Sequence, residues 1–145
     1  MMVHLIKLCV GVETLDQLES VQGERVARLE AETGRRAAWH VTRRMPRRAA
    51  ELCDGGSLYW IMRGHIRARQ RITDVRAITD RAGRAACAIE LDPALVPVVP
   101  RARKPFQGWR YLAPENAPPD QAERPDDSPE MPEWMVAELS ELGLL

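Results

Sequence analysis

The chain is poor in cysteine, and its cysteines do not follow the pattern of a metal site or a disulfide framework. The three residues, Cys9, Cys53 and Cys87, are far apart and have apolar neighbours. Disulfide-rich secreted chains are usually shorter and contain an even number of cysteines. Structural zinc sites usually begin with a C-x-x-C pair, which is absent here. We therefore expect small buried thiols, and neither a metal nor another cofactor.

Long apolar runs are also missing, because no stretch approaches the roughly 20 residues that a helix needs to cross a bilayer. Residues 1–10 (MMVHLIKLCV) have no basic leader and no small-residue cleavage site. They are typical of a β-strand rather than of a signal peptide. The sequence therefore predicts a cytoplasmic protein that does not contact a membrane.

The common motifs of enzymes do not occur in this chain. There is no G-x-x-x-x-G-K-[ST] or G-x-G-x-x-G phosphate loop and no G-x-S-x-G elbow. His4, His40 and His65 lack the spacing of metal ligands. Among the few carboxylates in the middle of the chain, Asp74 and Glu90 are the candidates for a general base. A catalytic function is therefore the weaker interpretation.

Charge is distributed unevenly, although the formal net charge of the whole chain is zero. Residues 1–34 contain 3 basic and 6 acidic residues, residues 35–110 contain 17 and 6, and residues 111–145 contain 1 and 9. The central part is thus net +11 and the C-terminal part net −8. This segregation indicates a basic surface for an anion, followed by an acidic tail. Nearly all the cations are arginines, which suit phosphate and base edges but also follow from a G+C-rich genome.

Period-two patterns and turn residues predict one mixed α+β domain over residues 1–112. The expected strands cover residues 3–10, 38–44, 57–62, 66–78, 87–91, 95–99 and 106–112. A helix is expected between Thr14, a capping residue, and Gly34, a favourable C-terminal residue, with further helical turns over residues 47–53. The length of the strand at 66–78 predicts a bend or bulge, and Pro97 confines its strand to an edge.

The acidic tail divides into two segments. Residues 113–132 contain six prolines and predict an extended or disordered linker. Residues 133–145 predict a short amphipathic helix with Trp134, Met135 and Leu139 on one side. This helix could dock permanently on the domain, or it could cover the basic face until a partner displaces it.

Three groups of residues are candidates for binding. On the strand at 66–78, Arg67, Arg69 and Arg71 share one face, and Gln70 lies on the apolar face, where its amide needs a partner. An anion would relieve the repulsion among these arginines, although a solvated face is the simpler explanation.

The second group surrounds Trp39 and includes Thr42, Arg43, Pro46 and Arg48. An aromatic ring beside a guanidinium suits a stacked base and its phosphate, although Trp39 could instead belong to the core.

The third group lies in residues 101–111, where Phe106, Gln107, Trp109 and Arg110 are interleaved with further cations. This composition is typical of a binding loop that leads into a strand.

Four segments resemble a family of proteins of unknown function, the one numbered 1489. They are VHLIKLCVG, WHVTRRMPRRAAEL, DGGSLYWIMRG with HIRARQRI, and RKPFQGWRYL, which together span most of residues 3–112. This resemblance implies no established activity.

A more distant resemblance is to the PUA-like barrels, including the EVE, ASCH and YTH groups. It rests on the order of a strand, a P-x-R-A-x-E-L helical turn, a D-G-G turn, an aromatic strand and a long strand. It implies a mixed β-barrel with an N-terminal helix and short flanking helices, and a pocket between barrel and helix for RNA or a modified base. The residues implied for this pocket are Trp39, Thr42, Arg43, Pro46, Trp60 and Trp109. The lysine, threonine and acid set of hydrolytic ASCH relatives has no match here.

The leading hypothesis is a small nucleic-acid-binding module that reads RNA, single-stranded DNA or a modified base. Two alternatives stay open: a nucleoside-directed hydrolase or transferase, and a partner-binding protein with an autoinhibitory acidic tail. The first alternative requires a carboxylate near Trp39, Trp60 and Trp109.

Overall fold

The computed structural model describes residues 2–121 of the chain. Its elements are β1 (His4–Leu8), α1 (Leu15–Thr33), β2 (Ala38–Thr42), α2 (Ala49–Leu52), β3 (Ser57–Met62), β4 (His65–Thr79), β5 (Ala85–Leu91), β6 (Val96–Ala102), β7 (Trp109–Leu112) and the 3-10 helix η1 (Pro114–Asn116). The expected α+β class is confirmed, and every expected strand is present with small differences at its ends.

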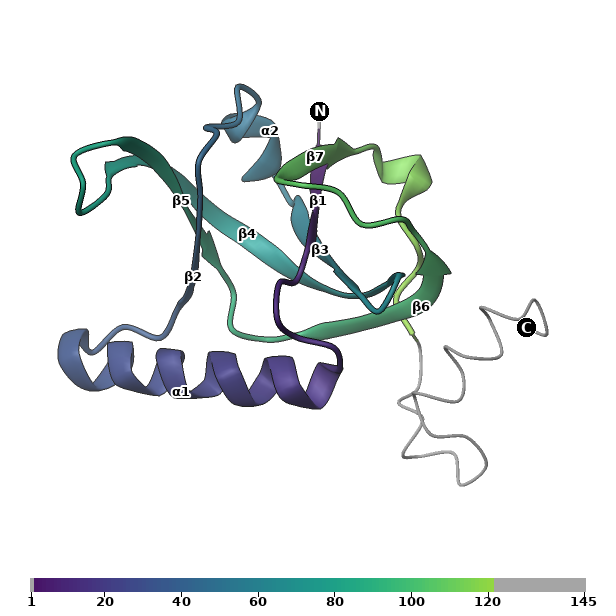
Figure 1. The fold of residues 1–145 in the computed structure, drawn as a ribbon, viewed down its shortest axis with the longest axis horizontal. Coiled ribbons are helices and arrows are strands. Elements are labelled where there is room, and N and C mark those ends of the chain that lie inside the picture. Colours follow the sequence, from purple (N-terminus) through teal and green to yellow (C-terminus); the bar gives the residue numbers. More distant parts are fainter. Residues whose placement is uncertain (1, 122–145) are drawn as a thin grey trace.

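The strands form one strongly curved mixed sheet (Figure 1). Their order is β2-β5-β4-β3-β1-β7, and β6 pairs with β4 beside this path. The pair β1–β3 is parallel, and the other pairs are antiparallel. Within residues 2–121, the outer strands β2 and β7 do not pair with each other, so the sheet is open and the expected mixed β-barrel is not confirmed.

Strand β4 is shared by the two halves of the sheet. Its first part pairs with β3 and β6, and its second part pairs with β5. The register shifts near Ile66–Ala68 and again between Ile72 and Asp74. These irregularities bend the strand, as its length predicts, because a bulge inserts an unpaired residue and increases the local twist.

Helix α1 runs across one end of the sheet, close to β2 (Figure 1). The hydroxyl of Thr14 accepts a hydrogen bond from the backbone N–H of Gln17 at 3.1 Å, which satisfies a free donor of the first turn. Gly34 ends the helix with φ at 72°, and its N–H donates to the Glu30 carbonyl at 2.8 Å. Both predicted ends of this helix are confirmed.

The two faces of the sheet have separate apolar clusters. The larger cluster includes Leu5, Leu58, Trp60 and Ile72, and Leu15, Leu18 and Val26 of α1 pack against it. The smaller cluster contains Ile6, Tyr59, Ile61, Ile66, Val98 and Leu112. Alternation along β3 explains this division, because successive side chains of a strand point to opposite faces. We call the face of Trp60 the helix face and the face of Tyr59 the outer face.

The first residues after β7 lie along β6. Val99 N donates to the Pro119 carbonyl at 2.9 Å, and Gln121 N donates to the Pro97 carbonyl at 2.9 Å. Residues 113–121, the first part of the expected linker, therefore pack on the domain. The rest of the expected linker and the expected C-terminal helix over residues 133–145 lie outside the described residues.

Within residues 2–121, no helix is long and apolar enough to span a membrane. The expected cytoplasmic location stays a prediction.

Candidate ligand-binding site

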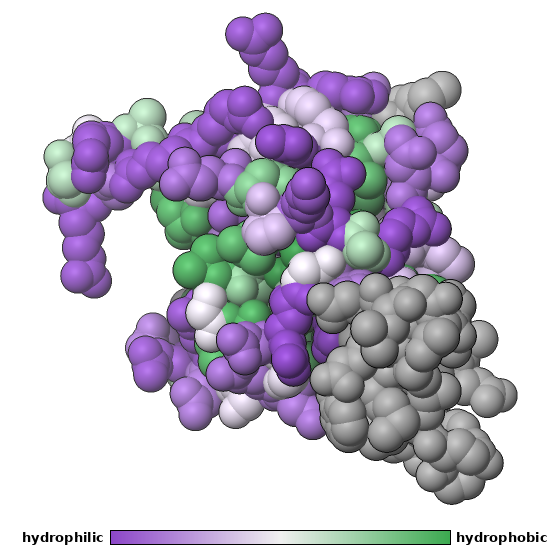
Figure 2. All heavy atoms as spheres, turned by 45° about the vertical axis from the view of Figure 1, so that its right-hand side comes forward, coloured by the Kyte–Doolittle hydropathy of each residue, from purple (hydrophilic) through white to green (hydrophobic). Residues whose placement is uncertain are grey.

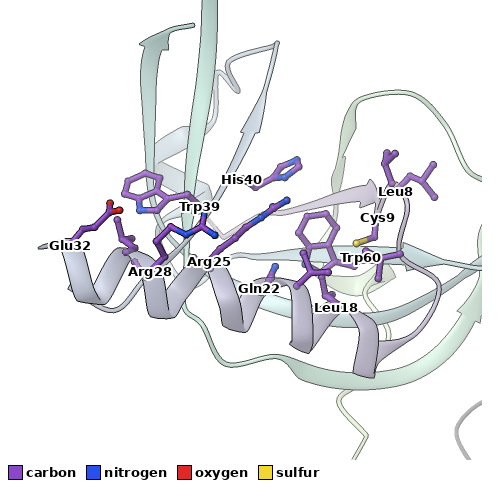
Figure 3. A pocket seen from close by; sticks show the side chains of 16 residues that line it. Leu8, Cys9, Leu18, Gln22, Arg25, Arg28, Glu32, Trp39, His40 and Trp60 are labelled. Atoms are coloured by element: carbon purple, nitrogen blue, oxygen red, sulfur yellow. The ribbon is translucent and has the colours of Figure 1, made fainter. Parts of the chain in front are cut away.

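A cavity of about 370 Å³ lies between α1, the end of β1 and the beginning of β2 (Figure 3). Small-molecule sites commonly measure about 300–1,000 Å³, so this cavity has the size of a compact ligand. Strands β1 and β2 are not neighbours in the sheet. The cavity therefore occupies the side on which the sheet stays open. The face of the molecule drawn in Figure 2 has a band of apolar residues with hydrophilic residues on both sides of it.

Helix α1 forms one complete wall of this cavity. The lining residues of the helix are Leu18, Val21, Gln22, Arg25, Arg28, Leu29 and Glu32. Their spacing of three and four residues places them along one face of an α-helix. An amide, two cations and an acid interrupt the apolar residues of this face, unlike the uniform apolar stripe of a helix that only packs against a core.

A network of amides and an indole forms the floor of the cavity. Gln70 is fully buried on β4, and its Oε1 accepts hydrogen bonds from Trp60 Nε1 at 2.8 Å and from Gln22 Nε2 at 2.9 Å. Its Nε2 donates to Gln22 Oε1 at 2.6 Å and to the Asp92 carbonyl at 3.1 Å. The apolar-face position predicted for Gln70 is confirmed, and protein groups already bind its amide. Gln22 and Trp60 are the members of the network that line the cavity, and Gln70 lies behind them.

His40 lines the cavity, and one of its ring nitrogens has no hydrogen-bond partner. Its ring meets the Trp60 ring edge to face, with centroids 5.2 Å apart and an interplanar angle of 89°. Nε2 is buried and makes no hydrogen bond. Burial, with smaller effects of Lys7 and Arg25, lowers the pKa of His40 to about 4. The imidazole is therefore neutral at physiological pH. Its Nε2 can donate or accept one hydrogen bond, depending on the tautomer.

Trp39 lines the cavity at the end opposite to Cys9 (Figure 3). The guanidinium of Arg76 lies 5.5 Å from the centre of the Trp39 ring. Because Trp39 is only half-buried, the cavity has one aromatic wall near solvent and a second, Trp60, at its inner end.

The cavity lacks an evident catalytic group. Burial raises the pKa of the Cys9 thiol to about 11, so the thiol is a poor nucleophile at neutral pH. Among the described residues, Glu32 is the carboxylate that lines the cavity, and it is exposed. Asp74 and Glu90 are not part of the lining and pair with Arg76 and Arg35. No three histidine, cysteine or acidic side chains of residues 2–121 group as metal ligands.

The three tryptophans do not converge on one cavity. Trp39 and Trp60 line it, whereas Trp109 does not. Trp109 is buried, stacks edge to face on Tyr111 with centroids 4.9 Å apart, and lies under the guanidinium of Arg44 at 4.0 Å. Its place in the sheet explains its burial without a ligand.

The predicted arginine row lies on the outer face, away from the cavity. Arg67 is buried beside the irregularity of β4, and Arg71 is exposed. Arg69 donates to both carboxylate oxygens of Asp120 at 2.7 Å and to Ser57 Oγ at 3.0 Å. An internal acid therefore already neutralises the middle arginine of the row.

The other candidates near β2 face different neighbours. Thr42 ends the strand, and Pro46 is buried in the following loop. Arg43 forms an ion pair of 2.6 Å with Asp80, and Arg48 forms one with Glu51. None of these four residues lines the cavity.

The predicted binding loop at residues 101–111 is a separate basic surface. Gln107 and Arg110 are exposed, and Phe106 has Arg110 at 4.3 Å and Arg103 at 5.5 Å from its ring centre. These cation–π contacts explain the interleaving of aromatic and basic residues without a ligand. A binding role for this loop stays a prediction.

Sequence reasoning missed most of the cavity lining. Gln22, Arg25 and Arg28 come from the N-terminal segment of net negative charge, and the pattern of His40 indicated only a strand residue. A signal did exist on α1, because its cations interrupt the apolar face at helical spacing. Sequence alone does not say which helix face meets an open side of the sheet.

A family model described as "Protein of unknown function (DUF1489)" matches residues 5–145 of the chain. The chain belongs to this family. The resemblance based on the four sequence segments is thereby confirmed, and membership in the family assigns no activity. Searches of the curated proteins and of the solved structures found no match.

Proposed function

We propose that the protein is a small nucleic-acid-binding module that holds one unpaired base in the cavity between α1 and β2. The observation that carries this proposal is the buried, unpartnered Nε2 of His40 against the ring of Trp60. A buried polar group without a partner is costly, and a ligand that forms one hydrogen bond there would remove that cost.

The surroundings of His40 suit a planar, uncharged ring. Trp39 and Trp60 offer aromatic surfaces, and stacking on an aromatic side chain contributes roughly 1–3 kcal/mol per base. Gln22 can present an amide edge to a base. The resemblance to the PUA-like barrels also implies a pocket between a helix and the sheet. We propose this relationship together with the function and do not use it as evidence.

Titration with single-stranded RNA and single-stranded DNA at two salt concentrations tests the proposal. We expect quenching of tryptophan fluorescence and an affinity that falls as salt rises. His40→Ala should weaken binding at least tenfold, whereas the exposed Arg47→Ala should leave it within twofold. Absence of binding at low salt, or equal binding by the His40 variant, would contradict the proposal.

One contact supports a second role, in which the acidic tail competes with an anionic ligand. Asp120 is the last acidic residue that the structure describes, and it binds Arg69 through both oxygens, as a phosphate would. Hydrogen bonding to Arg69 lowers the pKa of Asp120, so the pair is fully charged at neutral pH. We propose that the acids after it act similarly on other cations of the domain.

A further inference from the structure

Among residues 2–121, the cations nearest to the cavity pair with no carboxylate, unlike many other arginines of this part of the chain. Arg25 and Arg28 line the cavity and are exposed. Within the described part of the chain, the side chains of Arg25, Arg28 and Lys7 form neither ion pairs nor hydrogen bonds. By contrast, Arg35, Arg43, Arg48, Arg69 and Arg76 each pair with a carboxylate.

The positions of these three cations converge on the cavity. In Figure 3, the side chains of Arg25 and Arg28 reach from α1 across the cavity toward His40 and Trp39. Lys7 is opposite Trp60 in the β1–β3 register, so it lies on the helix face. Lys7 and Arg25 are close enough to add to the lowering of the His40 pKa by burial and to oppose the rise that burial causes in the pKa of Cys9.

The cavity therefore joins a neutral interior to a cationic rim. Inside are Trp60, neutral His40 and the amide of Gln22. At the rim, Arg25 and Arg28 are three residues apart on one helix face, which allows both to contact the same group. Glu32, one turn beyond Arg28, is the acid among the lining residues. Such a site suits a ligand with a planar uncharged part and an anionic part attached to it.

We infer that the ligand is a nucleotide whose phosphate is held at this rim by Arg25 and Arg28, with Lys7 adding positive charge, while its base occupies the cavity. This inference rests on the proposed function and names the phosphate contacts of that site. It places the phosphate path over α1, and not over Arg67, Arg69 and Arg71 on the outer face. The phosphate can belong to a free nucleotide or to a single strand.

The test compares full-length wild type with Arg25→Gln/Arg28→Gln. The control, Arg47→Gln/Arg81→Gln, changes the charge equally at two exposed arginines outside the cavity lining. Glutamine and arginine have similar helix propensities, and thermal melts check folding. The probes are a mixture of the four nucleoside 5′-monophosphates and a random-sequence single-stranded RNA hexamer, which distinguish the two sources of phosphate.

At low salt, we expect Arg25→Gln/Arg28→Gln (the α1 variant) to bind both probes at least tenfold more weakly than wild type. The affinity of the control variant should stay within twofold of wild type. The slope of log affinity against log salt for the hexamer should fall by about 0.7, because one phosphate contact on a single strand contributes about that much. If the α1 variant binds like wild type while His40→Ala does not, the phosphate inference is overturned and the base-binding function stands. If wild type binds neither probe at low salt, both are wrong.

Discussion

Arg44 and Trp109 bind each other's backbone across the open side of the sheet. Arg44 Nη2 donates to the Trp109 carbonyl at 3.0 Å, and Trp109 Nε1 donates to the Arg44 carbonyl at 2.8 Å. Arg44 follows β2 and Trp109 begins β7, the two outer strands of the sheet. This side-chain contact joins strands that form no backbone pair.

The first prediction concerns this contact. Arg44→Ala should lower the free energy of unfolding by about 1–2 kcal/mol, because it removes one hydrogen bond and one cation–π contact. Urea unfolding of Arg44→Ala, Trp109→Phe and the double variant forms a cycle that isolates their coupling. The exposed Arg47→Ala is the control, with a change within about 0.5 kcal/mol. Strict additivity of the two substitutions would contradict the cation–π contact between the side chains, because each hydrogen bond ends on a backbone carbonyl that the other substitution keeps.

Gln70 should be essential for the cavity floor. Gln70→Leu leaves the buried Trp60 N–H without an acceptor, and we expect it to destabilise the fold by about 1–3 kcal/mol. Gln107→Leu makes the same chemical change at an exposed position and should have little effect. Chemical denaturation measures both variants, and equal stabilities would refute the role of the network.

The low pKa of His40 predicts a loss of stability in acid. The unfolded chain binds a proton near pH 6.5 and the folded protein near pH 4, so stability from this residue is present above pH 6.5 and falls as pH drops toward 4. The total loss is roughly 3 kcal/mol, at about 1.4 kcal/mol for each unit of pKa difference. Lys7 and Arg25 face the ring as cations, and Trp60 faces it without a charge.

Unfolding of wild type and His40→Gln between pH 7 and pH 4 measures this effect. Burial also lowers the pKa of His4, but that contribution is common to both proteins and cancels in the difference. The variant should lose less stability than wild type over this interval, and parallel curves would show that His40 does not titrate as described.

Two glycines should respond oppositely to alanine. A Cβ on Gly56 would lie 2.2 Å from the Val3 carbonyl oxygen and 2.5 Å from that of Leu52, so Gly56→Ala should destabilise by roughly 1–3 kcal/mol or prevent folding. A Cβ on Gly23 of α1 would meet nothing within 4 Å. Gly23→Ala should therefore raise the melting temperature, since alanine in a helix is favoured by about 0.5–1 kcal/mol. Thermal melts that compare the two variants with wild type measure both effects, and a shift of both melting temperatures in the same direction would contradict the prediction.

The acidic tail offers the fifth prediction. In the full chain, changing Glu123, Asp126, Asp127 and Glu130 to their amides removes four negative charges. If the tail competes with nucleic acid, the affinity for single-stranded RNA should rise several-fold at low salt and less at high salt, where charges are screened. An unchanged affinity at low salt would discard autoinhibition.

Local patterns predicted the elements well because their causes are local. The caps Thr14 and Gly34 lie beside the helix that they end, and the apolar run over residues 57–62, which follows a D-G-G turn, marks β3 with both ends correct. The excessive length of the strand after it predicted the bend of β4.

The binding site was harder to predict because its causes lie far apart in the chain. Asp120 neutralises Arg69 from 51 positions further along the chain, and Asp80 pairs with Arg43 from the turn between β4 and β5. Summing charge over the segment at 35–110 therefore counted arginines that the fold neutralises. The same sum assigned Arg25 and Arg28 to an acidic segment, although they lie at the cavity.

Strand β4 also has a consequence for the order in which the protein forms. Its backbone supplies hydrogen bonds to β3, β5 and β6, so the two halves of the sheet can join only when this strand is in place. Amide protons near Ala68–Ile72 should exchange with solvent only through global unfolding, whereas those of the projecting turn at Asp80–Arg84 should exchange through local opening (Figure 1). The cavity floor, with Gln70 at its centre, is thus part of the most slowly opening region of the molecule.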